Sequence, residues 1–230
     1  AWWIQRVRHA LGIYDLLRID HFRGFDTYWA IPADSTTAKT GKWETGPRME
    51  LFNALEGALG KLPIIAEDLG ELFPSVRELL ADSTFPGMKV LQFAFGGGDS
   101  EYLPHNHVKN SVVYPGTHDN TTITAWWESA ATPKEKATAA AYLHLTGAHP
   151  TAKEVAAVKT ADARTALLRA ALGSVADRAI IPMYDWLGLG EEAHLNTPGK
   201  LGGNWAWRAA AGFESKTLAK TIADECSVYC

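Results

Sequence analysis

The sequence has 230 residues, of which 47% are hydrophobic and 21% charged, and its formal net charge at pH 7 is −4. A chain of this length and apolar content can bury one sizeable core or two small ones. Basic and acidic residues are interspersed, so we expect no basic field that attracts nucleic acid or an anionic membrane. No apolar run approaches the roughly 20 residues that span a bilayer, and residues 1–6 lack a signal-peptide pattern. We therefore expect a cytoplasmic globular protein.

The sequence offers little for a metal or a cofactor. Cys226 and Cys230 lie in the last five residues, and a pair of cysteines without further ligands is too few for a structural zinc site. His105 and His107 have no adjacent carboxylates, and the glycines at 96–98 do not follow a phosphate-binding spacing. We expect neither a metal nor a cofactor, and we interpret the two cysteines as tail residues.

Helices and short strands alternate along the chain. Helical spacing of apolar residues predicts helices over residues 3–14, 49–59, 75–80, 121–129, 132–145 and 152–172, with a closing helix after residue 213. Short apolar runs predict strands over residues 16–19, 63–69, 88–95, 111–114 and 179–185. Residues 31–47 and 187–213 are predicted as long loops, and capping boxes are expected at Ser75–Glu78 and Thr132–Glu135.

Three of the predicted strands end in a carboxylate: Asp20, Glu67 and Asp119. Parallel strands joined by helices place their carboxyl ends on one side of the sheet, so we expect these acids to converge. Arg18 and Asp20 are two residues apart and share one face of a strand. They are expected to pair with each other or with a ligand, and the alternative is a structural ion pair at a sheet end. The fifth predicted strand also ends in an acid, Asp185.

Alternating strands and helices predict an α/β protein with about five βα units. Two architectures remain open on this count. An open, doubly wound sheet needs only five strands, whereas an eight-stranded (β/α) barrel needs three more units. Acids at several strand ends and the absence of a glycine-rich first turn favour the barrel.

Five motifs, in this order, resemble those of one enzyme family: RIDHFRGF at 18–25, IAEDLG at 65–70, YLPHN at 102–106, GTHDN at 116–120 and GNWAWR at 203–208. They are similar to the 4-α-glucanotransferases called amylomaltases or disproportionating enzymes, which form glycoside hydrolase family 77 in the α-amylase clan. The resemblance extends from Trp2 to about Phe213. It implies that residues 1–230 are the C-terminal part of a catalytic (β/α)8 TIM barrel whose N-terminal strands are missing. Departures from the family pattern are Thr121, where an acid is usual, and Tyr184, where glutamine is usual.

The resemblance also implies a chemistry and a set of residues. Asp20 is expected as nucleophile, Glu67 as acid/base and Asp119 as stabiliser of a distorted sugar in a retaining double displacement. The expected substrates are maltooligosaccharides or starch-like α-1,4-glucans, and a plastid location is expected if the source is photosynthetic. Five residues are predicted to bind substrate: Arg18, His118, Asn120, Trp43 and Asn204. For Trp43 the alternative is a packed loop, since Trp is often a core residue.

Two further interpretations of function stay open. An α-glucan hydrolase of the same clan would use the same three carboxylates and differ in water access. An inactive glucan-binding fragment is the other, because a partial barrel leaves strand edges unpaired.

Overall fold

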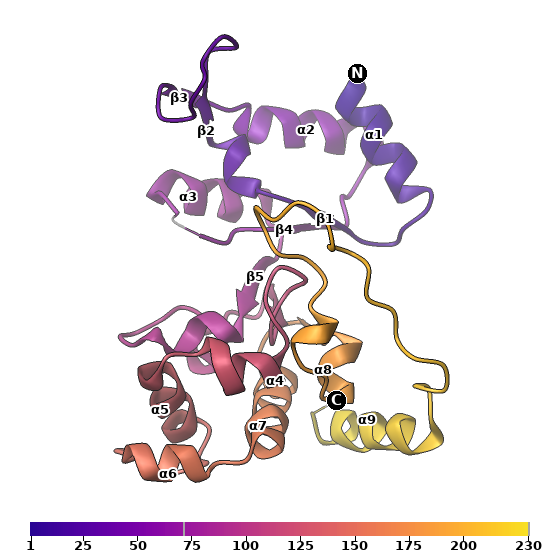
Figure 1. Cartoon of the computed structure of the whole chain (residues 1–230). Helices are drawn as coiled ribbons and strands as arrows, with labels where there is room; N and C mark the ends of the chain where they lie inside the picture. The colour runs from indigo at the N-terminus through magenta and orange to yellow at the C-terminus, as the bar shows by residue number, and fades with distance from the viewer. Residues whose placement is uncertain (71, 230) are drawn as a thin grey trace. The chain divides into compact units, whose positions relative to one another are not determined.

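The computed structural model describes residues 1–70 and 72–229, so Cys230 lies outside the described residues. The chain divides into two compact units, Ala1–Met88 and Lys89–Cys230, which are taken one at a time below. Figure 1 shows the order of the elements along the chain.

The first unit is built around two parallel strands. Its elements are α1 (Trp2–Leu11), β1 (Leu17–Ile19), η1 (Phe22–Phe25), β2 (Thr27–Ala30), β3 (Lys42–Thr45), α2 (Arg48–Leu59), β4 (Ile64–Ala66) and α3 (Pro74–Ser83), and β5 (Gly87–Val90) begins within it. β1 and β4 pair in parallel, with Leu17 opposite Ile64 and Ile19 opposite Ala66. The sequence prediction of a strand before each of the first two acids is therefore confirmed.

Glycine ends the first two helices, as the sequence predicts. Gly12 caps α1, and Gly60 ends α2 in a backbone conformation with φ of 77°, which glycine adopts without strain. The predicted capping box at Ser75–Glu78 is wrong, because α3 begins at Pro74 after Phe73. The Ser75 hydroxyl donates instead to the buried carboxylate of Asp26 at 2.7 Å.

Aromatic rings fill the core of the first unit. Phe22 and Phe52 stack with centroids 5.6 Å apart, and Phe85 meets Phe52 edge-on at 5.2 Å. Helices α1, α2 and α3 and strands β1 and β4 supply the buried apolar side chains around these rings. The burial of Phe22 fixes the start of η1, which begins two residues after Asp20.

The predicted loop over residues 31–47 contains a strand that the sequence analysis missed. β3 pairs antiparallel with β2, and Trp29 lies directly opposite Trp43. Because Pro32, Gly41 and Gly46 break the apolar pattern of this segment, no periodicity of two is visible in the sequence.

The second unit combines a short sheet with several helices. Its elements are η2 (Leu91–Gly96), η3 (Pro104–Asn106), β6 (Ser111–Tyr114), α4 (Ile123–Ala125), the π-helix η4 (Trp126–Ala130), α5 (Pro133–Tyr142), α6 (Ala152–Ala157), α7 (Thr160–Leu172), β7 (Arg178–Ala179), α8 (Met183–Leu187), η5 (Glu191–Ala193) and α9 (Lys216–Tyr229). The sheet has the order β5-β6-β7, and β6 and β7 run parallel.

Two predicted strands of this unit are shorter than expected. Only the first part of the predicted strand over 88–95 is extended, and the chain turns into the 3-10 helix η2 after Val90. The predicted strand over 179–185 ends at Ala179, and Pro182 precedes helix α8. Asp185 therefore lies in a helix, and its placement at a strand end is wrong. The capping box at Thr132 is confirmed, with Glu135 as its partner.

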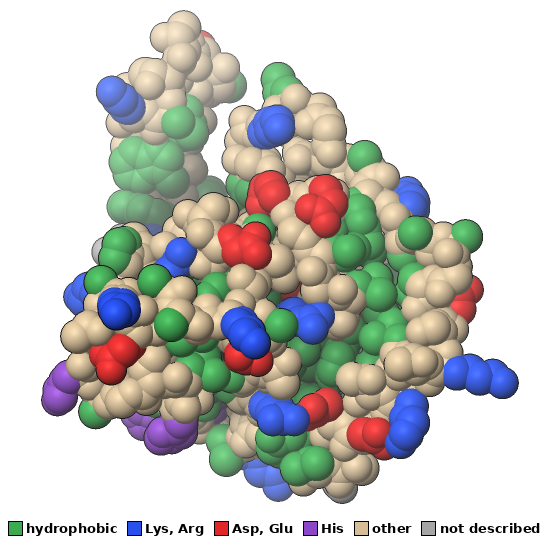
Figure 2. All heavy atoms as spheres, turned by 60° about the horizontal axis from the view of Figure 1, so that its bottom comes forward, with side chains coloured by type: hydrophobic (Ala, Val, Ile, Leu, Met, Phe, Trp, Pro, Cys, Tyr) green, Lys and Arg blue, Asp and Glu red, His purple; other side chains and the backbone are tan. Residues whose placement is uncertain are grey.

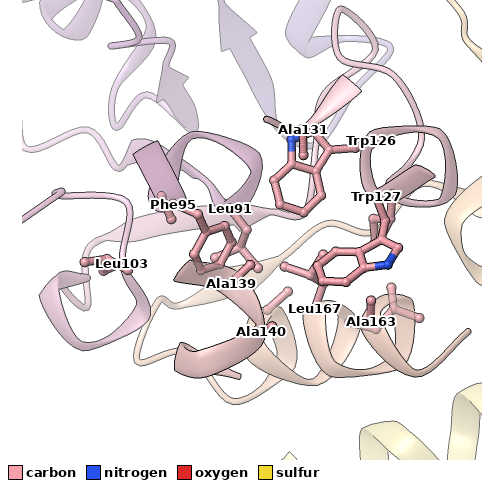
Figure 3. Packing of buried hydrophobic residues seen from close by; sticks show 14 of the residues in the cluster. Leu91, Phe95, Leu103, Trp126, Trp127, Ala131, Ala139, Ala140, Ala163 and Leu167 are labelled. Carbon is pink, nitrogen blue, oxygen red and sulfur yellow. The ribbon is translucent and has the colours of Figure 1, made fainter. Parts of the chain in front are cut away.

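The core of the second unit gathers around two adjacent tryptophans. Trp126 and Trp127 are almost fully buried and pack against Phe95, Leu167 and small residues of α5 and α7, as Figure 3 shows. The alanines of these helices, which include Ala139, allow the helix backbones to approach closely. This Trp pair is therefore part of the packing.

The described structure is α/β, as predicted. Its strands form pairs β1-β4 and β2-β3 and the triplet β5-β6-β7 in the part of the chain that the structure describes. This pattern confirms the α/β class, while the partial (β/α)8 barrel with about five βα units stays a prediction. On the face seen in Figure 2, acidic and basic side chains are interspersed with apolar ones. No helix in residues 1–70 and 72–229 has the length and apolarity that a membrane span requires.

Candidate active site

Asp20 and Glu67 directly follow the paired strands β1 and β4. The backbone pairing continues past both strands, because the Glu67 amide donates to the Ile19 carbonyl at 2.9 Å and the Phe22 amide to the Glu67 carbonyl at 3.0 Å. The two residues that come after the matched pair Ile19 and Ala66 are thus held beside each other. The sequence prediction that these two strand ends deliver carboxylates to one place is confirmed within the first unit.

Arg18 contacts both of these carboxylates. Its Nη1 lies 3.0 Å from Oδ1 of Asp20, and its Nη2 lies 4.0 Å from Oε2 of Glu67. The side chain of Asp20 is 79% exposed, whereas that of Glu67 is only 13% exposed. The predicted pairing of Arg18 with Asp20 is confirmed, and the same guanidinium also faces Glu67.

Backbone amides fix the carboxylate of Glu67. The His21 amide donates to Oε2 at 2.6 Å and the Leu69 amide to Oε1 at 3.2 Å. His21 has a φ of 48°, in the left-handed region that non-glycine residues rarely occupy. Such conformations cost about 1–3 kcal/mol and persist where the surrounding structure imposes them, often at functional sites.

Asp68 has a different role from its neighbour. It is buried, and its Oδ1 accepts a hydrogen bond from the Met88 amide at 2.6 Å. A Cβ on Gly87 would lie 2.5 Å from Oδ2 of Asp68, so only glycine fits beside it. Asp68 thus connects the end of β4 to β5.

Trp43 lies on the β2–β3 hairpin in contact with other rings. Its ring centroid is 5.4 Å from that of Trp29 and 5.8 Å from that of Phe73. The Arg23 guanidinium lies 4.8 Å from the Trp43 centroid and 4.4 Å from that of Phe73. Trp43 still exposes 51% of its surface, so it is neither buried core nor an isolated ring.

In the second unit, a tight turn after β6 carries His118 and Asp119. Oδ1 of Asn120 accepts hydrogen bonds from the amide and the hydroxyl of Thr117, both at 2.9 Å. The predicted ligand Asn120 therefore closes the turn through its own side chain. Nε2 of His118 lies 3.3 Å from Oδ2 of Asp119.

The segment after η5 completes the surroundings of Asp119. Asn196 donates from Nδ2 to Oδ1 of Asp119, and its amide donates to the His118 carbonyl at 3.0 Å. The Trp205 ring lies 5.0 Å from the His118 ring, and Trp205 has a φ of 59°. The sequence analysis missed Asn196, whose signal was its place at the start of the turn sequence Asn-Thr-Pro-Gly.

Asn204 belongs to the same segment but uses its polar atoms locally. Its Oδ1 accepts from the Thr197 amide and its Nδ2 donates to the Lys200 carbonyl, both at 3.0 Å. These bonds stabilise the loop that carries Trp205, whose ring contacts His118. Asn204 is thus connected with His118 through this loop.

Residues from η2 and α8 anchor both ends of the Asp119 turn. Nε2 of Gln92 donates to the Thr121 carbonyl at 2.8 Å, and the Tyr184 hydroxyl donates to the Thr117 carbonyl at 3.3 Å. Oδ1 of Asp185 accepts from the Ile123 amide at 2.8 Å.

Asp185 is also electrostatically unusual. Burial raises the pKa of its carboxyl to about 7, against the opposing effects of the Ile123 amide and of Arg164. Sequence reasoning missed its contact with Ile123 because a strand, rather than α8, was expected there.

A cavity of about 520 Å³ opens elsewhere in the second unit. It lies among η4, α5 and α6, with Trp127, Pro133 and Val155 in its walls, and none of the predicted site residues lines it. Among residues 1–70 and 72–229, no three or more His, Cys, Asp and Glu residues are grouped to hold a metal ion.

The parallel strands and the helices that follow them define the chain as an α/β protein, and its paired strands β1 and β4 end in carboxylates. Residues 1–213 match the model of glycoside hydrolase family 77, described as 4-α-glucanotransferase, and the chain belongs to this family.

Relatives and solved structures agree with this assignment. The chain is 45% identical to the chloroplastic/amyloplastic 4-α-glucanotransferase DPE1 of Arabidopsis thaliana, over all of this chain and 38% of that protein. It is 43% identical to the 4-α-glucanotransferase of Clostridium butyricum, over 96% of this chain and 43% of the relative. The amylomaltase of Streptococcus agalactiae, solved in complex with acarbose, superposes with a TM-score of 0.87 at 36% identity, over 99% of this chain and 44% of that one. The chain thus spans about two fifths of the length of these proteins.

Proposed function

We propose that this chain supplies the catalytic carboxylates of a 4-α-glucanotransferase that moves α-1,4-glucan segments between maltooligosaccharides. The observation that carries the proposal is the contact of one guanidinium, Arg18, with both Asp20 and Glu67 at the ends of paired strands. Retaining glycosidases need two carboxyl groups about 5 Å apart. The amylomaltase neighbour bound to acarbose supports an α-glucan as substrate.

In the proposed reaction, Glu67 donates a proton to the glycosidic oxygen while a carboxylate oxygen of Asp20 attacks the anomeric carbon. The leaving glucan departs with that proton, and the remaining segment is bound to Asp20 as an ester. Glu67, now ionised, takes the proton of an acceptor hydroxyl, which attacks the same carbon and releases Asp20. Two inversions retain the anomeric configuration.

The environment of each group supports its role. The Arg18 guanidinium pairs with the Asp20 carboxylate at 3.0 Å, and this ion pair orients the group that attacks. The amides of His21 and Leu69 orient Glu67, and orientation of a general acid is a condition for proton transfer.

Asp119 is proposed to hold the hydroxyls of the distorted sugar. Its contacts with His118 and Asn196 fix it in one orientation, and hydrogen bonds of this kind strengthen in the transition state. Arg18, His118, Asn120, Trp43 and Asn204 are proposed to surround the substrate, with the last acting through its own loop. A partial (β/α)8 barrel, with these strand ends on one face, is the architecture that would bring the groups together.

The test is incubation with maltotriose, with and without the amino-terminal segment of a relative, while products are followed by chromatography. Transfer yields glucose together with maltooligosaccharides longer than maltotriose. Glucose and maltose without longer products would show a hydrolase instead. The absence of turnover in both samples, with the folded state verified by circular dichroism, would contradict the proposal. The compartment of the protein stays a prediction; the names of plant relatives place those proteins in plastids.

A further inference from the structure

One face of the β2–β3 hairpin carries only aromatic and hydroxyl side chains. Alternate residues of a strand share a face, so Thr27 and Thr45, which lie opposite each other, share theirs with Trp29 and Trp43. Trp29 is 38% and Trp43 is 51% exposed. The charged residues of β3 point to the other face, where Lys42 and Glu44 pair at 2.6 Å.

The rings of this face are held in place. Nε1 of Trp29 donates to the Ala38 carbonyl at 2.8 Å. A Cβ on Gly41 would lie 2.7 Å from the Trp29 ring and 2.6 Å from the Ala30 carbonyl oxygen, so the glycine permits the ring to pack against the turn. A surface whose side chains are already ordered loses little conformational entropy when a ligand binds.

The rings of this face contact two residues that follow the predicted catalytic residues closely in the sequence. Arg23 lies against the rings of both Trp43 and Phe73, which also contact each other, and Phe73 is 36% exposed. Arg23 belongs to η1, which begins two residues after Asp20, and Phe73 ends the segment that follows Glu67. Both segments that follow the carboxylates therefore contribute a residue to this cluster of rings.

We infer that Trp29, Trp43 and Phe73, with Arg23, form an aromatic ledge that binds a segment of an α-1,4-glucan. Glucose rings have apolar faces that stack on aromatic rings and a rim of hydroxyls that needs hydrogen-bond partners. The ledge offers both, with Thr hydroxyls and a guanidinium beside the rings. This inference rests on the proposed function and extends it to a binding surface beyond the carboxylates.

Other occupants fit the ledge less well. An amphipathic helix lays its apolar face into a hydrophobic groove, whereas this face alternates indoles with the hydroxyl groups of threonines. For an acidic ligand the face offers one cation, Arg23, which already packs against two rings.

The experiment measures the affinity for maltoheptaose by isothermal titration calorimetry, in a Glu67→Gln background that prevents turnover. We expect Trp29→Ala and Trp43→Ala each to weaken binding about fivefold, and Trp43→Phe, which keeps a ring, to bind as the parent does. Trp2→Ala is the matched control, since Trp2 is 61% exposed and also lies under an arginine, Arg6, at 5.3 Å. It should leave the affinity unchanged.

Unchanged affinity in both Trp29→Ala and Trp43→Ala would overturn the ledge. The ledge would also be overturned if these variants lost self-association, measured by sedimentation, but kept their affinity for the sugar. The face would then be a contact between copies of the chain. Conversion of maltotriose by protein with Glu67 intact tests the proposed function separately. If the protein transfers glucan but the Trp29 and Trp43 variants bind maltoheptaose as the parent does, the ledge alone is overturned. If these variants bind more weakly but the protein transfers nothing, the transferase activity alone is overturned.

Discussion

The backbone amide of His21 donates a hydrogen bond of 2.6 Å to Oε2 of Glu67. The residue that follows the predicted nucleophile, Asp20, therefore orients the predicted proton donor. Because β1 and β4 are paired in register up to these residues, a shift of either strand would disturb both carboxylates. The parallel pair thus serves as the frame that sets the geometry of the site.

The Glu67→Gln variant tests the proton donor. Glutamine keeps an oxygen that can accept from the His21 or the Leu69 amide but cannot release a proton. We expect transfer from maltotriose to fall about a hundredfold or more, with an unchanged circular dichroism spectrum. Glu56→Gln, on the exposed side of α2, is the control and should keep full activity. Retained transfer in Glu67→Gln would remove this residue from the mechanism.

The left-handed conformation of His21 predicts opposite effects of two substitutions. Glycine adopts a φ of 48° without strain, so His21→Gly should leave the free energy of unfolding unchanged or raise it slightly. His21→Val places a β-branched residue in this region and should cost about 1–3 kcal/mol. Urea denaturation followed by circular dichroism measures both values. Equal stability of the two variants would show that the backbone relaxes and that no strain is held beside Glu67.

The acids at the ends of β1 and β4 were predictable because short apolar runs and the charge that ends them are local patterns. The hairpin over residues 27–45 was not predictable from the sequence. Its strands pair Trp29 with Trp43 across a polar turn, and the apolar residues of this segment show no periodicity of two. Asp185 was misplaced for a related reason. The run from Ala179 to Tyr184 has the composition of a strand, but the strand ends at Ala179 and helix α8 begins after Pro182. Asn196 and Asp119 are 77 residues apart in the sequence, so no local sequence pattern predicts their contact.

The buried carboxyl of Asp185 predicts a pH dependence of stability. Its folded pKa of about 7 lies above the ordinary 3.8. At low pH the group is protonated in both states and contributes nothing. As pH rises from about 4 to 7, the unfolded state loses the proton first, so stability falls, by at most about 4 kcal/mol.

Asp185→Asn removes this titration and keeps an oxygen to accept from the Ile123 amide. We expect the free energy of unfolding of this variant, relative to that of the parent, to rise between pH 4 and pH 7. Urea denaturation at each pH measures this difference. The control is Asp162→Asn, an exposed carboxylate on α7 of the same unit. A constant difference between Asp185→Asn and the parent across this pH range would contradict a protonated, buried Asp185.

The hairpin that carries the aromatic ledge depends on the absence of a side chain at Gly41. An added Cβ would meet the Trp29 ring and the Ala30 carbonyl oxygen at less than 3 Å, so Gly41→Ala must displace the indole or separate the strands. We expect a loss of about 1–3 kcal/mol in the free energy of unfolding and a shift in tryptophan fluorescence. Gly57→Ala is the matched control, because a Cβ there meets nothing within 4 Å and lies within helix α2. It should stabilise by about 0.5–1 kcal/mol, whereas a gain in Gly41→Ala as well would mean that Trp29 is not packed against the turn.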